Sequence, residues 1–223
     1  MNLPTTTLSD MSLTDLERLI QTGEGKYLEF KRTIPSAKKI AREMAAFANS
    51  NGGTLLVGVD DDHRILGVDG YHEEEYLLTK AAQQLCSPTI DITIEVLPFD
   101  ERDILIIYVK ESEQKPIYLI HNERRVVYIR QRDKSVTASN EHAEILKNRY
   151  SERGVSFEYG PREQRLFQYL NEYERITVNE YSNLINVTSY RASKILINLV
   201  SAGILELLTR KNKDYYLFSN ECN

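Results

Sequence analysis

Cysteine is scarce in this chain of 223 residues, and the two that occur, Cys86 and Cys222, lie far apart in the sequence. This excludes a disulfide-rich scaffold and fits a reducing compartment. Long apolar runs are also missing, since none approaches the roughly 20 residues that span a bilayer. The Thr- and Ser-rich start lacks the basic and then apolar pattern of a signal peptide. We therefore expect a cytoplasmic protein without a membrane partner.

Excess positive charge is absent as well. The chain has 28 Lys and Arg against 33 Asp and Glu, a formal net charge of -5. This excludes a uniformly basic nucleic-acid coat, so any nucleic-acid surface must be a local patch of Lys and Arg. The four histidines have no zinc-ligand spacing with the cysteines, and no phosphate-binding glycine loop followed by Lys and Ser or Thr occurs. Zinc sites and P-loop nucleotide sites are therefore not indicated.

The first 139 residues contain strand and helix patterns in mixed order. Residues 27–32 alternate apolar and charged side chains, as a half-buried strand does, and 54–59 form the apolar run of a central strand. Adjacent hairpins favour an α+β fold over a doubly wound parallel sheet. The expected helices are 13–20, 35–48 and 72–85, and the expected strands are 27–32, 54–59, 65–68, 89–98, 104–109, 116–120 and 126–131.

The last third of the chain changes character. Pro161 begins a helix, Thr177 caps a second one, and Thr188 or Ser189 caps a third. Two strands joined by a basic turn follow. Helices and a basic-tipped hairpin in this order indicate a small winged-helix domain. The predicted division is an α+β domain at 13–139, a helical linker at 140–160 and a winged helix-turn-helix at 161–219.

The second helix of a helix-turn-helix pair lies in the major groove of DNA. We expect Arg191 and Lys194 to reach guanine edges or phosphates and Asn198 to pair with adenine. Because such proteins commonly read two half-sites, a homodimer is also expected. However, residues 160–223 hold eight Lys or Arg against seven Asp or Glu, so a protein-interaction module stays open as an alternative. The candidate DNA contacts are Ser189, Tyr190, Arg191, Lys194 and Asn198 on the helix and Arg210, Lys211 and Lys213 at the wing tip.

A series of short motifs runs through the first domain in a fixed order. They are Glu24 with Glu29-Phe30-Lys31, Ala46-Phe47-Ala48-Asn49, Gly52-Gly53-Thr54-Leu55-Leu56-Val57-Gly58-Val59-Asp60-Asp61, Gly67-Val68, Lys115-Pro116-Ile117-Tyr118 and Tyr128-Ile129-Arg130. With them, residues 13–139 resemble the Schlafen/AlbA-type (divergent AAA-associated) domain. The one departure is Gln131-Arg132-Asp133-Lys134-Ser135, where family members have a glycine-serine turn.

The resemblance carries functional implications. Bacterial members often add a winged helix and are described as transcriptional regulators, which makes DNA the expected partner, RNA a second one, and a cofactor unnecessary. In this domain the basic candidates for nucleic-acid contact are Lys31, Arg124, Arg125, Arg130 and Arg132.

Some Schlafen proteins cut structured RNA with two glutamates and an aspartate. Glu24, Glu29 and Asp60 match that pattern, with Asp61 as a substitute, and they would be both the catalytic residues and the ligands of Mg²⁺ or Mn²⁺. A metal-dependent nuclease is therefore the alternative to the regulator, and an interaction scaffold is the second alternative. The Asp60-Asp61-Asp62 run also suits a simple hairpin turn.

Overall fold

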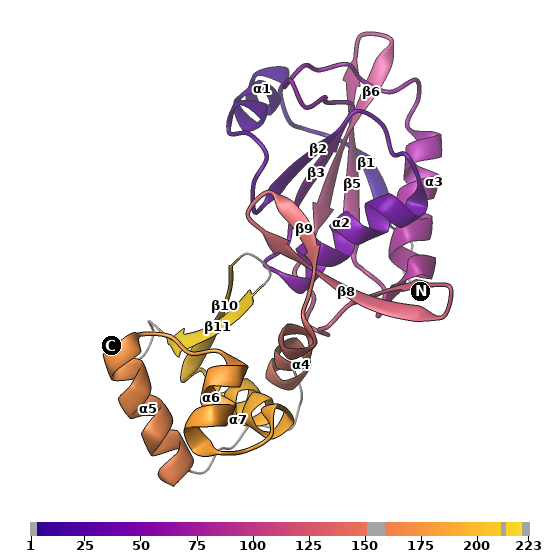
Figure 1. Cartoon of the computed structure of the whole chain (residues 1–223). Helices are drawn as coiled ribbons and strands as arrows, with labels where there is room; N and C mark the ends of the chain where they lie inside the picture. Colours follow the sequence, from indigo (N-terminus) through magenta and orange to yellow (C-terminus); the bar gives the residue numbers. More distant parts are fainter. Residues whose placement is uncertain (1–3, 151–158, 211–212, 220–223) are drawn as a thin grey trace. The chain divides into compact units, whose positions relative to one another are not determined.

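The computed structural model describes residues 4–150, 159–210 and 213–219. The chain separates into two compact units, Met1–Ala138 and Ser139–Asn223 (Figure 1).

A mixed sheet forms the centre of the first unit, with the strand order β1-β5-β6-β3-β2. Strands β5 (Ile92–Phe99) and β6 (Arg102–Val109) form an antiparallel hairpin, and β6 also pairs antiparallel with β3 (Gly53–Val57). The parallel pairs are β2 (Leu28–Lys31) with β3 and β1 (Thr5–Leu8) with β5. Parallel and antiparallel neighbours in one sheet, mixed with helices, confirm the predicted α+β fold class.

Helices cover both faces of this sheet. Helix α1 (Leu13–Gln21) buries Leu16 and Ile20 on one face. On the other face α2 (Ala37–Asn49) and α3 (His72–Lys80) share a core with apolar side chains of β3, β5 and β6. Figure 1 shows α2 lying across the sheet.

A second, smaller sheet has the order β4-β7-β8-β9. Its strands are β4 (Cys86–Ser87), β7 (Tyr118–His121), β8 (Arg124–Gln131) and β9 (Lys134–Thr137). Asn49, at the end of α2, connects the helix to this region: its side-chain amide donates to the carbonyls of Ile117 (2.8 Å) and Tyr128 (2.9 Å), and its oxygen accepts from the Ile117 N–H (2.7 Å). With neighbours on both sides, the second half of α2, from Glu43 to Asn49, has no exposed residue. Alanines therefore suit it, and Ala45, Ala46 and Ala48 are fully buried.

The turn before β3 requires glycine because of its backbone conformation. Gly52 has a φ of +71°, and a Cβ at this position would lie 2.8 Å from the Val109 carbonyl oxygen. Only glycine adopts this conformation without a steric cost. The glycine at position 52 is thus explained by its backbone conformation and by the close approach of the end of β6.

Several elements differ from the sequence-based expectations. The helix expected at 72–85 ends at Lys80 and continues as one π-helical turn, η1 (Ala81–Leu85). The expected strand 65–68 is reduced to two isolated bridges, Val59 to Ile65 and Val68 to Asp103. Strands β1, β4 and β9 were not expected, because their sequences are short and carry little apolar alternation.

The second unit contains α4 (Asn140–Arg149), α5 (Pro161–Tyr173), α6 (Val178–Ile185), α7 (Ser189–Ser201) and a hairpin of β10 (Leu205–Arg210) and β11 (Lys213–Phe218). Thr177 and Thr188 cap α6 and α7 as the sequence predicted, each accepting from the N–H three residues on. Ile176 forms a β-bridge with Tyr216 in β11. Helix α4, which the sequence analysis placed in a linker, contributes Ile145 to this unit's core. The assignment as a winged helix stays a prediction.

Candidate functional site

Arg130 lies at the centre of a buried ion cluster in the first unit. Its side chain is 0% exposed, and its Nη1 lies 3.0 Å from Glu29 Oε2 and 3.4 Å from Glu43 Oε2. Nη1 also donates to Ser135 Oγ (3.1 Å) and Nη2 to the Gly25 carbonyl (2.6 Å). The guanidinium carbon sits 4.5 Å from the centre of the Phe47 ring. Arg130, on β8, therefore connects this strand with β2, α2 and β9. The prediction that Arg130 contacts nucleic acid is wrong, because its side chain is not accessible to solvent.

The carboxylates of this cluster have further basic partners. Lys31 is ion-paired with Glu29, and Arg42 Nη2 lies 2.7 Å from Glu43 Oε1. We call Glu29, Glu43, Arg130, Lys31 and Arg42 the Arg130 cluster. Burial raises the pKa of Glu29, an effect that the hydrogen bond from Lys31 opposes and that the charges of Glu43 and Glu24 strengthen. The predicted role of Lys31 as a free phosphate contact is weakened, because its charge is already engaged by Glu29.

The structure places the three carboxylates of the nuclease hypothesis in different roles. Glu24 is exposed, and its Oε1 accepts from the Phe30 N–H at 2.8 Å. Glu29 belongs to the Arg130 cluster. Asp60 accepts from the N–H groups of Asp62 (3.0 Å) and Arg64 (2.9 Å) and from Arg64 Nε (2.9 Å). The backbone hydrogen bond from Arg64 is the main cause that lowers the Asp60 pKa.

Asp60 therefore organises a turn, and the next residues continue it: Asp61 is exposed and His63 has a φ of +65°. Within the ranges that the structure describes, His, Cys, Asp and Glu side chains form no group of three or more that would hold a metal ion. Glu24, Glu29 and Asp60 thus do not fit a divalent cation in the arrangement they have here.

Three of the arginines predicted to contact nucleic acid, Arg124, Arg125 and Arg132, are exposed and lie at two separate turns of the first unit. Arg124 and Arg125 are at the β7–β8 turn, with the Arg125 guanidinium carbon 4.3 Å from the centre of the Tyr118 ring. Arg132, which has a φ of +58°, is at the β8–β9 turn. The length of β8 separates the two turns by roughly 25 Å. Arg124, Arg125 and Arg132 therefore do not form one continuous basic patch along β8.

In the second unit, α7 has an exposed polar face. Ser189, Arg191 and Asn198 are exposed, and Tyr190 is 74% exposed. Lys194 is only partly free, because its ammonium group is ion-paired with Glu144 of α4 and lies 5.5 Å from the centre of the Tyr190 ring. The hydrogen bond to Glu144 raises the Lys194 pKa. Glu141, one turn earlier on α4, accepts from Ser193 Oγ at 3.2 Å.

The hairpin of this unit carries further cations. Arg210 and Lys213 are exposed, whereas Lys211 lies outside the described residues. Arg175 and Lys213 flank the Tyr215 ring, at 4.8 Å and 5.4 Å from its centre. The sequence analysis did not include Arg175 among the candidates, because it lies between α5 and the Ile176 bridge, outside the recognition helix and the wing tip.

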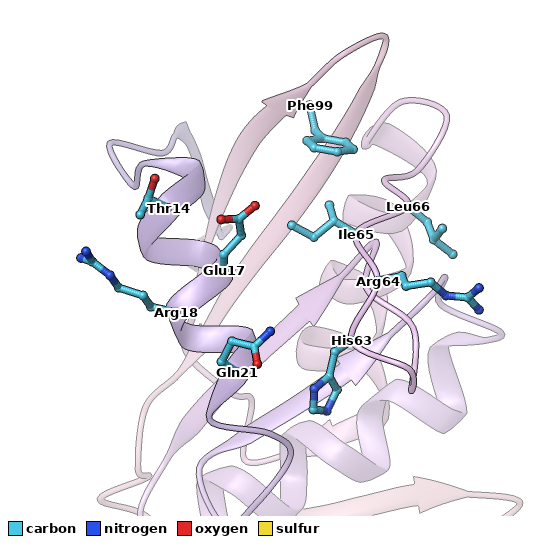
Figure 2. Close-up of a pocket in the computed structure, with 9 residues that line it drawn as sticks. All are labelled: Thr14, Glu17, Arg18, Gln21, His63, Arg64, Ile65, Leu66 and Phe99. Atoms are coloured by element: carbon cyan, nitrogen blue, oxygen red, sulfur yellow. The ribbon is translucent and has the colours of Figure 1, made fainter.

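A pocket of about 850 Å³ opens between α1 and the turn that follows Asp60. We call it the α1 pocket. Figure 2 shows Glu17 and Gln21 of α1 facing Ile65 and His63 across the hollow, with Phe99 at one end. No sequence signal indicated it, because its walls come from three separate segments. Its lining residues are Thr14, Glu17, Arg18, Gln21, His63, Arg64, Ile65, Leu66 and Phe99.

Within the described residues, each helix is too short or too polar to span a membrane.

The chain was compared with curated proteins, with solved structures and with protein families. No curated protein matches the chain. Among solved structures, a Corynebacterium diphtheriae protein is 20% identical with a TM-score of 0.43, and the match covers 56% of this chain but only 28% of that one. The N-terminal domain of an ATP-dependent DNA helicase RecG-related protein from Nitrosomonas europaea is 21% identical with a TM-score of 0.44, covering 67% of this chain and 98% of that domain.

The family comparison covers more than half of the chain. The model of the family described as Schlafen, AlbA_2 matches residues 24–139. This range contains the Arg130 cluster, the Asp60 turn and the arginine turns, and it ends where the second unit begins. The chain therefore belongs to the Schlafen AlbA_2 family, which points to a nucleic-acid-related function.

Proposed function

We propose that the protein is a DNA-binding transcriptional regulator whose second unit is a winged helix that binds duplex DNA. One observation carries this proposal: α7 presents Tyr190, Arg191 and Asn198 to solvent while its other face is buried in the core. A helix held in this way and exposing such side chains has the composition of a major-groove reading helix. The exposed Arg210 and Lys213 supply backbone contacts.

The cations on α7 have unequal roles in this proposal. Arg191 has no acidic partner among the described residues, so a phosphate or guanine edge binds it without competition. Lys194 must first leave Glu144. We therefore assign most of the helix's electrostatic contribution to Arg191 and a smaller share to Lys194.

The first unit adds phosphate contacts through Arg124, Arg125 and Arg132. Because their turns lie roughly 25 Å apart along β8, they contact separate stretches of a backbone, which suits duplex DNA or a structured RNA. A homodimer that reads two half-sites completes the proposal. The nuclease alternative gains no support from the described carboxylates, and the scaffold alternative requires that no nucleic acid binds.

The test is fluorescence anisotropy of a labelled duplex with the full-length protein, its Arg191→Ala variant and an Arg165→Ala control. Arg165 is an exposed arginine on α5 of the same unit, so the two variants carry the same charge change. We expect Arg191→Ala to lose tenfold or more in affinity, about 1–3 kcal/mol, and Arg165→Ala to bind like the wild type. Equal binding by all three proteins contradicts the assignment, and absence of binding favours the scaffold.

A parallel incubation of duplex DNA and hairpin RNA with Mn²⁺ or EDTA tests the alternative. Cleavage that requires Mn²⁺ and is lost in Glu29→Gln establishes the nuclease and displaces the regulator as the leading function. Intact nucleic acid in both conditions leaves the regulator in place.

A further inference from the structure

We propose that the α1 pocket is a binding site for a small organic cation, a guanidinium or ammonium group carried on an apolar stem. This goes beyond the DNA-binding function and does not depend on it, because the pocket lies entirely within the first unit.

The pocket is bounded by fixed walls. Helix α1 begins at the Ser12 cap and is anchored by Leu16 and Ile20, which leaves Glu17 and Gln21 directed into the hollow (Figure 2). The opposite wall is the turn that Asp60 organises through its backbone hydrogen bonds. His63 in that turn makes an edge contact with the buried Phe30 ring, 5.5 Å between ring centres. A pocket whose walls are already ordered binds a ligand without paying the entropy of forming the site.

The lining charge that has no ion-pair partner among the described residues is negative, and this decides the ligand class. Glu17 has no hydrogen-bond or ion-pair partner among the described residues. Both arginines of the lining are ion-paired with aspartates: Arg18 lies 3.2 Å from Asp15, and Arg64 lies 2.8 Å and 3.0 Å from Asp60 and Asp62. Figure 2 shows the guanidinium groups of both pointing away from the hollow.

A phosphate entering this pocket would be repelled by the unpaired Glu17 carboxylate, and the lining has no unpaired Arg or Lys side chain that would offset this repulsion. A cation would instead pair with Glu17. Ile65 and the Phe99 ring give the apolar surface for its stem, and an aromatic face also attracts cations. The side-chain oxygen of Gln21 is available as a second acceptor for the N–H groups of the ligand.

The test uses two probes of the same shape and different charge, butylguanidinium and its neutral counterpart butylurea. Binding to the full-length protein is followed at pH 8 by NMR shifts of the Ile65 and Leu66 methyl groups, because both residues line the pocket. We expect butylguanidinium to shift these signals saturably and to bind about fivefold more tightly than butylurea, as one exposed ion pair allows. The preference should disappear in Glu17→Gln and persist in Glu73→Gln, an exposed glutamate on α3 at the other face of the sheet.

Three results overturn the proposal. They are equal binding of the two probes, a cation preference that persists in Glu17→Gln, and tighter binding of inorganic phosphate than of butylguanidinium at the same methyl groups. Since Glu17 is exposed, Glu17→Gln is expected to fold. Gln21→Ala provides a second variant, which should weaken butylguanidinium binding without removing the preference over butylurea. DNA binding is measured separately, so its failure has no bearing on this result.

Discussion

Replacement of Arg130 by alanine should destabilise the first unit severely. The side chain is completely buried and neutralises two buried carboxylates, those of Glu29 and Glu43. Removing one partner of a buried ion pair typically costs about 3–5 kcal/mol. Lys31 and Arg42 remain beside the glutamates and reduce this cost, whereas the lost contact with the Phe47 ring adds to it. We expect a loss of about 3 kcal/mol, a large fraction of the roughly 5–15 kcal/mol that stabilises a typical domain.

The pH dependence of this loss follows from the Glu29 pKa. Burial raises that pKa in the folded protein above its unfolded value. Glu29 therefore contributes most to stability below its unfolded pKa, and this contribution is lost as the pH rises through the folded pKa. Without Arg130 the folded pKa should rise further. The deficit of Arg130→Ala relative to the wild type should consequently shrink as the pH is lowered from 7.5 towards 5.

The assay is urea unfolding followed by far-ultraviolet circular dichroism at both pH values, with the transition of the first unit identified by NMR. Arg132→Ala is the matched control: it is an exposed arginine two residues further along the chain and should change stability by less than about 0.5 kcal/mol. Adding Glu29→Gln and Glu43→Gln to Arg130→Ala should restore part of the loss. If Arg130→Ala costs no more than Arg132→Ala, or if its deficit grows at low pH, the account of the Arg130 cluster is refuted.

Three further changes test other contacts. Glu144→Gln should release Lys194 and tighten DNA binding about threefold, measured by anisotropy; weaker binding would mean that Glu144 positions Lys194 rather than competing with DNA. Asn49→Ala should destabilise the first unit by about 2–3 kcal/mol in urea unfolding, because it leaves buried carbonyl and N–H groups of the segment around Ile117 without partners; a loss below 0.5 kcal/mol contradicts that role. Gly52→Ala should cost more than about 1 kcal/mol in the same assay, and an unchanged midpoint would show that the turn relaxes.

Local sequence patterns predicted much of the fold. The alternation in 27–32, the apolar run that became β3 and the hairpin around Asp100 depend on neighbouring residues, and the structure has strands or a turn at each of these places. Strands β1 and β9 depend on pairing with β5 and β8. Their sequences carry little apolar alternation, so the local pattern gave no signal.

The candidate site was harder to predict, because its contacts join residues that are distant in the sequence. Arg130 was grouped with the neighbouring arginines as a candidate for nucleic-acid contact, which requires an exposed side chain. Its partners Glu29 and Glu43 are 101 and 87 residues away in the sequence, so no local pattern indicates that the charge is neutralised. Lys194 similarly matches an exposed helix position, yet its acidic partner is 50 residues away on α4.

The salt dependence of DNA binding tests the central proposal most directly. The logarithm of the binding constant should fall linearly with the logarithm of salt concentration for the full-length protein, because Lys and Arg displace counterions from the phosphates. If α7 lies on DNA, Arg191→Ala should reduce the magnitude of this slope by about 1, whereas Arg165→Ala should leave it unchanged. A wild-type slope near zero, or an Arg191→Ala slope equal to that of the wild type, would contradict the proposal that the second unit binds DNA through α7.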